Sequence, residues 1–161
     1  MVLVAVSFAI SGCGKEKAPP KPPPAVQAHQ PAPKIIAGAD EYRRGKSLLT
    51  EGRETDALRL LEQSVRANSK LTEAWYELGR IKVKRAPELS KSDEQAGVVM
   101  FREGLEAEKE ALRLIDAGAT VFWSEDDRVQ AREQLDTDLA NAGDALNDED
   151  TLRQALRMRV H

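Results

Sequence analysis

The sequence predicts an all-α protein, in which a helical domain of about 125 residues follows a non-globular N-terminal segment. Seven of the eight prolines lie in residues 19–33, ahead of a region where apolar side chains recur with the 3.6-residue period of helices. The composition, with 41% hydrophobic, 32% charged and 4% aromatic residues, is typical of charged helical proteins. It argues against an all-β sandwich and excludes a transmembrane bundle.

Residues 1–12 have the character of an export signal. The first ten are apolar apart from Ser7, and this run is too short to span a bilayer of about 30 Å as a helix. The next residues complete the sequence Ile-Ser-Gly-Cys, which ends at Cys13 and resembles the lipobox of bacterial lipoproteins. The resemblance implies cleavage before a lipidated, palmitate-bearing Cys13. The alternative is a buried apolar strand with an incidental cysteine.

A lipidated Cys13 would hold the protein on a membrane, because two acyl chains give stable attachment without a spanning helix. Gly14 follows the cysteine, where the enterobacterial sorting rule places aspartate in lipoproteins of the inner membrane. The resemblance therefore implies the periplasmic face of the outer membrane rather than the inner membrane. Since no Lys or Arg precedes the apolar run, we expect the natural translation start to lie upstream. A single cysteine allows no internal disulfide.

Residues 13–38 form a proline-rich linker. Proline removes amide donors and fixes φ, so the segment favours extended polyproline II, at about 3.1 Å per residue, and cannot pack a core. We expect a disordered tether. A Pro-x-x-Pro ligand for a groove-binding domain is the functional alternative.

Two pairs of short antiparallel helices are expected from Ala39 onward. In each pair apolar residues fall on one helical face, and turn or capping residues precede the run. The faces comprise Ala57, Leu58, Leu61 and Val65, then Ala74, Trp75, Leu78 and Ile81. Aligning the second pair on the first gives a period of 34 residues and places Gly79 on Gly45.

The run Thr-Glu-Ala-Trp-Tyr-Glu-Leu-Gly at residues 72–79 resembles the first helix of a tetratricopeptide repeat (TPR). The first repeat matches at Gly45, Leu48, Ala57, Leu61 and Ser64, and departs at Glu41, Arg44 and Ser69. The second has Lys82 where an aromatic residue is usual, and it regains the pattern only if about six extra residues form a loop within residues 85–93. The resemblance implies two stacked repeats within residues 39–118. An ordinary antiparallel helical bundle is the alternative.

Small residues at the repeat positions are expected to let the paired helices approach closely. They are Gly45, Ala57, Gly79, Gly97 and Gly104. Large side chains should fill the gaps between layers, namely Leu61, Trp75 and Phe101.

The last helix of the repeats should run on to a C-cap at Gly118. Its apolar stripe comprises Val98, Phe101, Leu105, Leu112 and Ile115. We expect charged residues to coat its other side, namely Glu106, Glu108, Lys109, Glu110 and Arg113.

Residues 119–161 are predicted to cap the stack. A short apolar connector carries Phe122 and Trp123, and the residues from Ser124 to Asp127 resemble a capping box with aspartate in place of glutamate. A helix to about Leu146 and a final helix opening near Asp148 should follow. Phe122 and Trp123 are expected to plug the junction; an exposed docking patch is the alternative.

An enzyme is not expected. His29 lies in the linker and His161 is the last residue, so neither a histidine-based triad nor a typical zinc site can form in the helical domain. The acidic clusters lie where helix N-termini favour negative charge, and they lack the spacing of a calcium loop. No glycine-rich phosphate loop follows a strand. We therefore expect no catalytic residue, no metal and no cofactor.

The TPR resemblance implies a protein-binding groove on the first helices of the repeats. Its candidate residues are Tyr42, Lys46, Leu49, Tyr76, Arg80, Val83 and Lys84, within a wider set that adds Ala39, Thr50 and Glu73. The two tyrosines and the three basic residues would suit an extended peptide with acidic groups or a terminal carboxylate. The lysine and asparagine clamp of chaperone-tail binders is absent, because Tyr42 and Lys46 occupy two of its positions.

The sequence thus predicts an envelope lipoprotein that binds another protein as an adaptor or assembly factor. A self-associating structural lipoprotein, using its acidic C-terminal helices, is the alternative. Nucleic acid is not an expected partner, because residues 35–161 carry 20 basic and 26 acidic side chains. The oligomeric state does not follow from the sequence.

Overall fold

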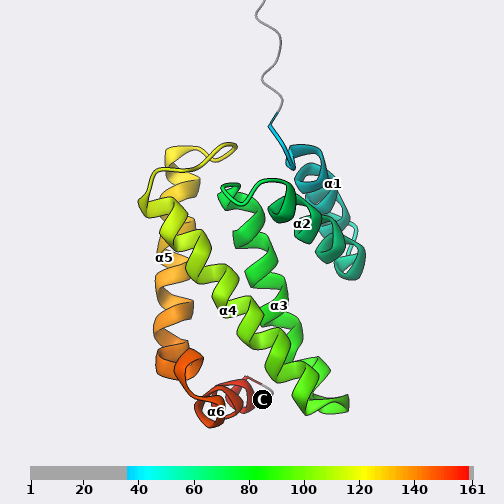
Figure 1. Cartoon of the computed structure of the whole chain (residues 1–161), viewed down its shortest axis with the longest axis vertical. Coiled ribbons are helices and arrows are strands. Elements are labelled where there is room, and N and C mark those ends of the chain that lie inside the picture. Colours follow the sequence, from blue (N-terminus) through cyan, green and yellow to red (C-terminus); the bar gives the residue numbers. More distant parts are fainter. Residues whose placement is uncertain (1–35, 160–161) are drawn as a thin grey trace, which may run out of the picture. The chain divides into compact units, whose positions relative to one another are not determined.

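The computed structural model of the chain describes residues 36–159. The expectations for the signal segment, Cys13 and all but the end of the linker lie outside this range. Every regular element within it is helical, as predicted (Figure 1). The elements are α1 Ala39–Thr50, α2 Glu54–Ala67, α3 Thr72–Ser92, α4 Glu94–Asp116, α5 Glu125–Ala142, the 3₁₀ helix η1 Gly143–Asn147, and α6 Glu149–Met158. None of these helices is long and apolar enough to cross a membrane.

The first helix pair, α1 and α2, packs around Gly45. A Cβ added to Gly45 would lie 3.2 Å from Leu61 Cγ, so the small residue permits the close approach that the sequence predicts. The chain reverses between the helices at Gly52, whose φ of 76° favours glycine. Leu61 and Ala57 are fully buried in this contact.

The second pair, α3 and α4, differs from the expectation of a loop within residues 85–93. α3 continues through Pro87 to Ser92, and Asp93 alone connects it to α4, accepting a hydrogen bond of 2.9 Å from the Ala96 amide as N-cap. The extra residues therefore lengthen the helix. Proline inside a helix removes a backbone hydrogen bond, but here the packing of α3 against α4 outweighs that cost. Ala86 is fully buried, and the two helices are so close that a Cβ on Gly97 would lie 2.7 Å from Ser90 Cα.

Close contact between α3 and α4 depends on two further glycines. A Cβ at Gly79 would lie 2.9 Å from the backbone nitrogen of Glu108, and one at Gly104 would lie 2.8 Å from that of Val83. Real Cβ contacts are not this short, so only glycine fits. The prediction that small residues bring these helices together is confirmed.

The helix boundaries after α4 follow the predicted capping signals. Gly118, with φ of 71°, ends α4 in a Schellman motif, since its amide donates to Ile115 O and the Ala119 amide donates to Leu114 O, both at 2.9 Å. Ser124 and Asp127 form the predicted capping box at the start of α5. Asp148 caps α6, while α5 itself ends at Ala142 and η1 covers the residues to Asn147.

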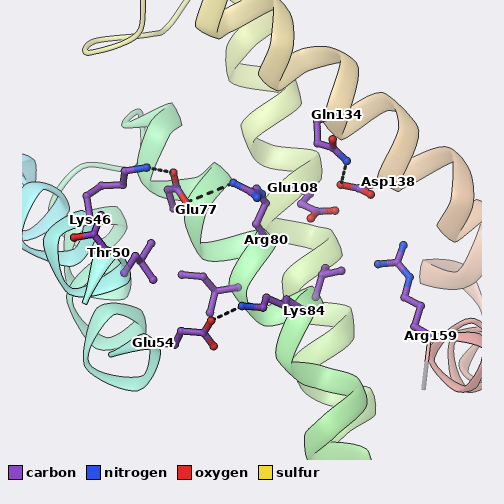
Figure 2. Close-up of a pocket in the computed structure, with 13 residues that line it drawn as sticks. Lys46, Thr50, Glu54, Glu77, Arg80, Lys84, Glu108, Gln134, Asp138 and Arg159 are labelled. Carbon is purple, nitrogen blue, oxygen red and sulfur yellow. Dashed lines mark hydrogen bonds and ion pairs between the residues drawn. The ribbon is translucent and has the colours of Figure 1, made fainter. Parts of the chain in front are cut away.

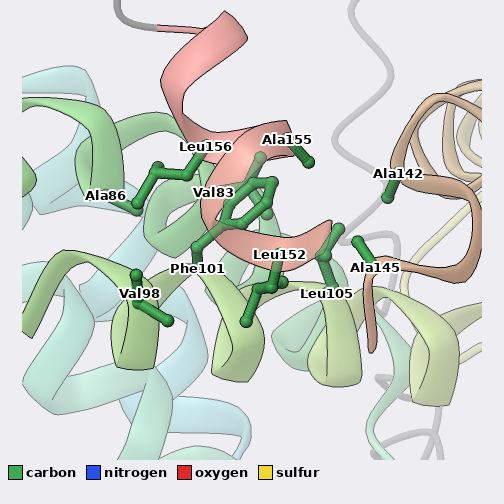
Figure 3. Close-up of a cluster of buried hydrophobic side chains, with 10 residues drawn as sticks. All are labelled: Val83, Ala86, Val98, Phe101, Leu105, Ala142, Ala145, Leu152, Ala155 and Leu156. Atoms are coloured by element: carbon green, nitrogen blue, oxygen red, sulfur yellow. The ribbon is translucent and has the colours of Figure 1, made fainter. Parts of the chain in front are cut away.

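The core consists of three clusters. One joins α1, α2 and the first half of α3; a second joins the later part of α3 and the first half of α4 to η1 and α6; a third lies between the end of α4 and α5. Figure 3 shows Phe101 in the second cluster beside Leu152 and Leu156 of α6. The C-terminal helices therefore pack directly on the second helix pair. Trp75, expected between layers, is only half-buried, and its indole Nε1 donates to Ser69 O at 3.0 Å.

Candidate functional site

A cavity of about 560 Å³ lies where side chains of α1, α3, α4 and α5 converge (Figure 2). Five of the seven candidate groove residues line it, namely Lys46, Leu49, Arg80, Val83 and Lys84. They come from α1 and α3, the first helices of the two pairs, whose residues 46 and 80 are related by the 34-residue period. The sequence pattern therefore identified side chains that share one cavity.

The two candidate tyrosines lie elsewhere. Tyr42 is only 6% exposed and stacks on Phe122 with a ring-centroid distance of 5.4 Å. Burial, with Glu77 and Glu73 nearby, raises the pKa of the Tyr42 phenol above its ordinary value. The Tyr76 ring meets the Trp123 ring edge-on at 5.0 Å. The segment between α4 and α5 thus covers both rings, and the expectation that Tyr42 faces an open groove is wrong.

Glu73, in the first turn of α3, holds this connecting segment in place. The carboxylate is fully buried, and its Oε1 accepts from the backbone amides of Val121 and Phe122, both at 2.6 Å, and more weakly from Trp123 at 3.3 Å. Thr72 Oγ1 donates to Ala119 O beside it. Phe122 and Trp123 therefore pack within the domain, in agreement with the predicted plug, and do not form an exposed docking patch.

The basic side chains of the cavity are interleaved with acidic ones. Lys46 Nζ donates to Glu77 Oε1 at 2.5 Å, and Lys84 Nζ donates to Glu54 Oε1 at 2.6 Å. Arg80 lies 4.0 Å from Glu77. The sequence singled out these three cations as a basic strip, and the structure shows that two of them already have close carboxylate partners.

Glu108 of α4 is the most unusual group in the cavity wall. Its side chain is fully buried, and neither carboxylate oxygen has a hydrogen-bond partner. Burial, assisted by the negative charge of Asp138, raises the pKa of Glu108 to about 7, although Arg159 and Arg80 oppose the shift. Figure 2 shows the carboxyl group between Arg80 and Asp138.

The prediction that Glu108 lies on the charged side of α4 is wrong. The spacing from Phe101 through Leu105, Glu108 and Leu112 to Ile115 is that of one helical stripe, so Glu108 interrupts the apolar face. That interruption was the sequence signal for this site. No comparable pattern marks the other acidic and polar residues that tertiary packing brings to the cavity, namely Glu54, Glu77, Gln134 and Asp138.

Within residues 36–159, no group of three or more His, Cys, Asp or Glu side chains could hold a metal ion. The cavity instead offers paired charges, one unpaired buried carboxyl group and the apolar side chains of Leu49, Ile81 and Val83. Such a lining suits the binding of a polar or amphipathic group. No protein-family model, curated protein or solved structure matches this chain.

Proposed function

We propose that this protein is a lipid-anchored adaptor or assembly factor of the bacterial cell envelope, which binds a segment of another protein in the cavity between α1, α3, α4 and α5. One observation carries the proposal: five residues chosen from the sequence as a binding groove line this single cavity. A volume of about 560 Å³ falls in the range typical of ligand sites, roughly 300–1,000 Å³.

The two helix pairs support a TPR-like interpretation of residues 39–118. Gly45 and Gly79, 34 residues apart, occupy equivalent places, since each lies against the second helix of its own pair. The second pair departs from the usual repeat because α3 has 21 residues and α4 has 23. The cavity then corresponds to the concave groove of the family, closed on one side by α5.

Membrane attachment rests on the sequence around Cys13 and on the proline-rich segment that would separate the anchor from the domain. Labelled palmitate tests it. Cells producing the protein with its full natural signal should incorporate the label, and Cys13→Ala should abolish incorporation and release the protein from the membrane. Labelling that persists in the alanine variant contradicts the lipoprotein assignment.

Crosslinking in intact cells, followed by mass spectrometry, tests the cavity as the binding site. Lys46→Gln and Lys84→Gln remove cavity charges without placing a negative charge beside Glu77 or Glu54, whereas Lys109→Gln changes an exposed lysine elsewhere on α4. A defined partner should be recovered less from the two cavity variants and equally from the control. Recovery of only the protein itself supports the self-associating alternative and contradicts the adaptor.

A further inference from the structure

The charges of the cavity do not balance locally. Lys46 and Lys84 are matched by Glu77 and Glu54 at 2.5 and 2.6 Å. The inner side, formed by α4 and α5, carries two carboxyl groups. Glu108 is buried without a hydrogen-bond partner, and Asp138 accepts from the neutral amide of Gln134 at 2.9 Å. Arg80 and Arg159 also line the cavity, but no cation forms a hydrogen bond or ion pair with Glu108.

The two cations nearest to Glu108 are engaged with other groups. The Arg80 guanidinium lies 5.3 Å from the centroid of the Tyr76 ring and 4.0 Å from Glu77. The Arg159 guanidinium lies over the Phe101 ring, 5.3 Å from its centroid. Both lower the pKa of Glu108, but neither donates a hydrogen bond to it.

An unpaired carboxylate in such a place is costly. Removing a carboxylate from water without a donor costs several kcal/mol, so the group either takes up a proton or acquires a cationic partner. A ligand that brings an ammonium or guanidinium group satisfies Glu108 directly. Arg80 lines the cavity together with Glu108, and because its side chain is 51% exposed it can move outward to admit the group.

We infer that the inner side of the cavity binds the cationic end of a lysine or arginine side chain of the partner protein, with Glu108 and Asp138 as acceptors. The apolar side chains of Leu49, Ile81 and Val83 would pack against the methylene stem. The inference rests on the proposed function. It reverses the preference for an acidic peptide that the sequence suggested, because Lys46 and Lys84 are already paired with Glu77 and Glu54.

The pH dependence follows from the groups that face Glu108. These are Asp138 on α5, Arg80 on α3 and Arg159 after α6, and together with burial they leave the Glu108 pKa at about 7. A cationic ligand requires the ionised form. Affinity should therefore rise about tenfold between pH 6 and pH 8, because the ionised fraction rises by that factor, and binding at pH 7 should release protons.

The test uses the full chain and three peptides that differ only at the centre, with lysine, norleucine or glutamate between flanking alanines. Nuclear magnetic resonance titration should show the lysine peptide binding at least tenfold more tightly than the norleucine peptide at pH 8, and with little preference at pH 6. Glu108→Gln should remove the preference at pH 8, whereas Glu106→Gln, an exposed site on the same helix, should keep it. Asp138→Asn, at a partly exposed position, should reduce the preference for the lysine peptide. This variant provides the test if Glu108→Gln does not fold.

Equal binding of the lysine and norleucine peptides, tighter binding of the glutamate peptide, or binding of none of the three overturns the inference. So does a lysine preference that survives in Glu108→Gln. These outcomes are separable from the proposed function: cellular capture that still depends on Lys46 and Lys84 would preserve the adaptor proposal without the lysine site. A lysine preference, combined with cellular capture that is unchanged in the Lys46 and Lys84 variants, would preserve the lysine site and contradict the adaptor proposal.

Discussion

Glu108 shows how one side chain can conflict with the packing around it. Its neighbours on the same stripe of α4, such as Phe101 and Leu105, are fully buried apolar groups, and Gly79 of α3 lies against its Cγ. The position would suit leucine. A carboxyl group here destabilises the folded state when it is ionised.

Glu108→Gln is therefore expected to stabilise the protein at alkaline pH. The folded-state pKa, about 7, is higher than the roughly 4.3 of an unfolded glutamate, so the native state binds more protons between these values. The contribution of protonated Glu108 to the free energy of unfolding is thus fully present below about pH 4 and is lost as pH rises through 7. Denaturant unfolding should show the variant more stable than the wild type by about 1–3 kcal/mol at pH 8, with the gain shrinking as pH falls and vanishing near pH 4. A pH-independent difference contradicts this.

Trp75 and Phe101 exemplify what a residue pattern can and cannot predict. Both were expected to fill gaps between helices, because large residues at these spacings usually do. Only Phe101 is fully buried, whereas Trp75 lies at the edge of two clusters with its indole N–H bonded to a loop carbonyl. The depth of a side chain depends on which elements pack beyond it, and the helical period carries no information on that.

Phe101→Ala should accordingly cost about 3–5 kcal/mol of unfolding free energy, as fully buried aromatic residues do. Trp75→Ala should cost clearly less, about 1–3 kcal/mol, because part of its surface is already exposed and its neighbours can relax into solvent. Equilibrium urea denaturation of both variants measures the two values. A larger loss for Trp75→Ala would contradict this description of the core.

At the scale of elements, the segment between α4 and α5 is the structure that shapes the site. Its Phe122 and Trp123 rings contact Tyr42 and Tyr76, and neither tyrosine lines the cavity. The helices, the caps at Gly118, Ser124 and Asp148, and the close glycine contacts could be predicted from local signals. The covering of the tyrosines could not, since it depends on a contact between residues about 50 positions apart, through Glu73.

Glu73→Ala should release this segment. The change leaves the amides of Val121 and Phe122 without an acceptor, and hydrogen bonds to a charged group contribute about 1.5–3 kcal/mol each. We expect a loss of about 2–4 kcal/mol and faster chymotrypsin cleavage after Phe122. Glu73→Gln, which keeps an acceptor oxygen, should recover part of the stability. Unchanged cleavage in Glu73→Ala would show that the segment is held by its aromatic rings alone.

The prediction of a loop within residues 85–93 was wrong, because contacts between two helices outweighed the local signals for a helix end. Pro87 and the polar residues after it are local signals for a helix end. They are outweighed because Ala86, Ser90 and Gly97 let α3 and α4 stay in contact along the added turns. These added turns lengthen the second pair, and Ala86 within them belongs to the cluster on which α6 packs.

At the scale of the whole molecule, the all-α class could be predicted from composition and period, and a family resemblance singled out five residues that line the cavity. The charge balance of the site could not, because the partners of Lys46 and Lys84 lie 31 and 30 residues away in sequence. Acidic residues are numerous in this chain, and only the packing of the helices decides which of them reach the cavity.

Site-specific photocrosslinking tests the central claim most directly. A photoreactive amino acid at Thr50, an exposed residue of the cavity wall, should capture one defined partner protein in intact cells, and Glu108→Gln should weaken that capture. The same group at Val99, which is 41% exposed on α4 and does not line the cavity, should capture it poorly. Equal capture of the partner from both positions, or adducts of the protein with itself alone, would contradict binding of a partner in this cavity.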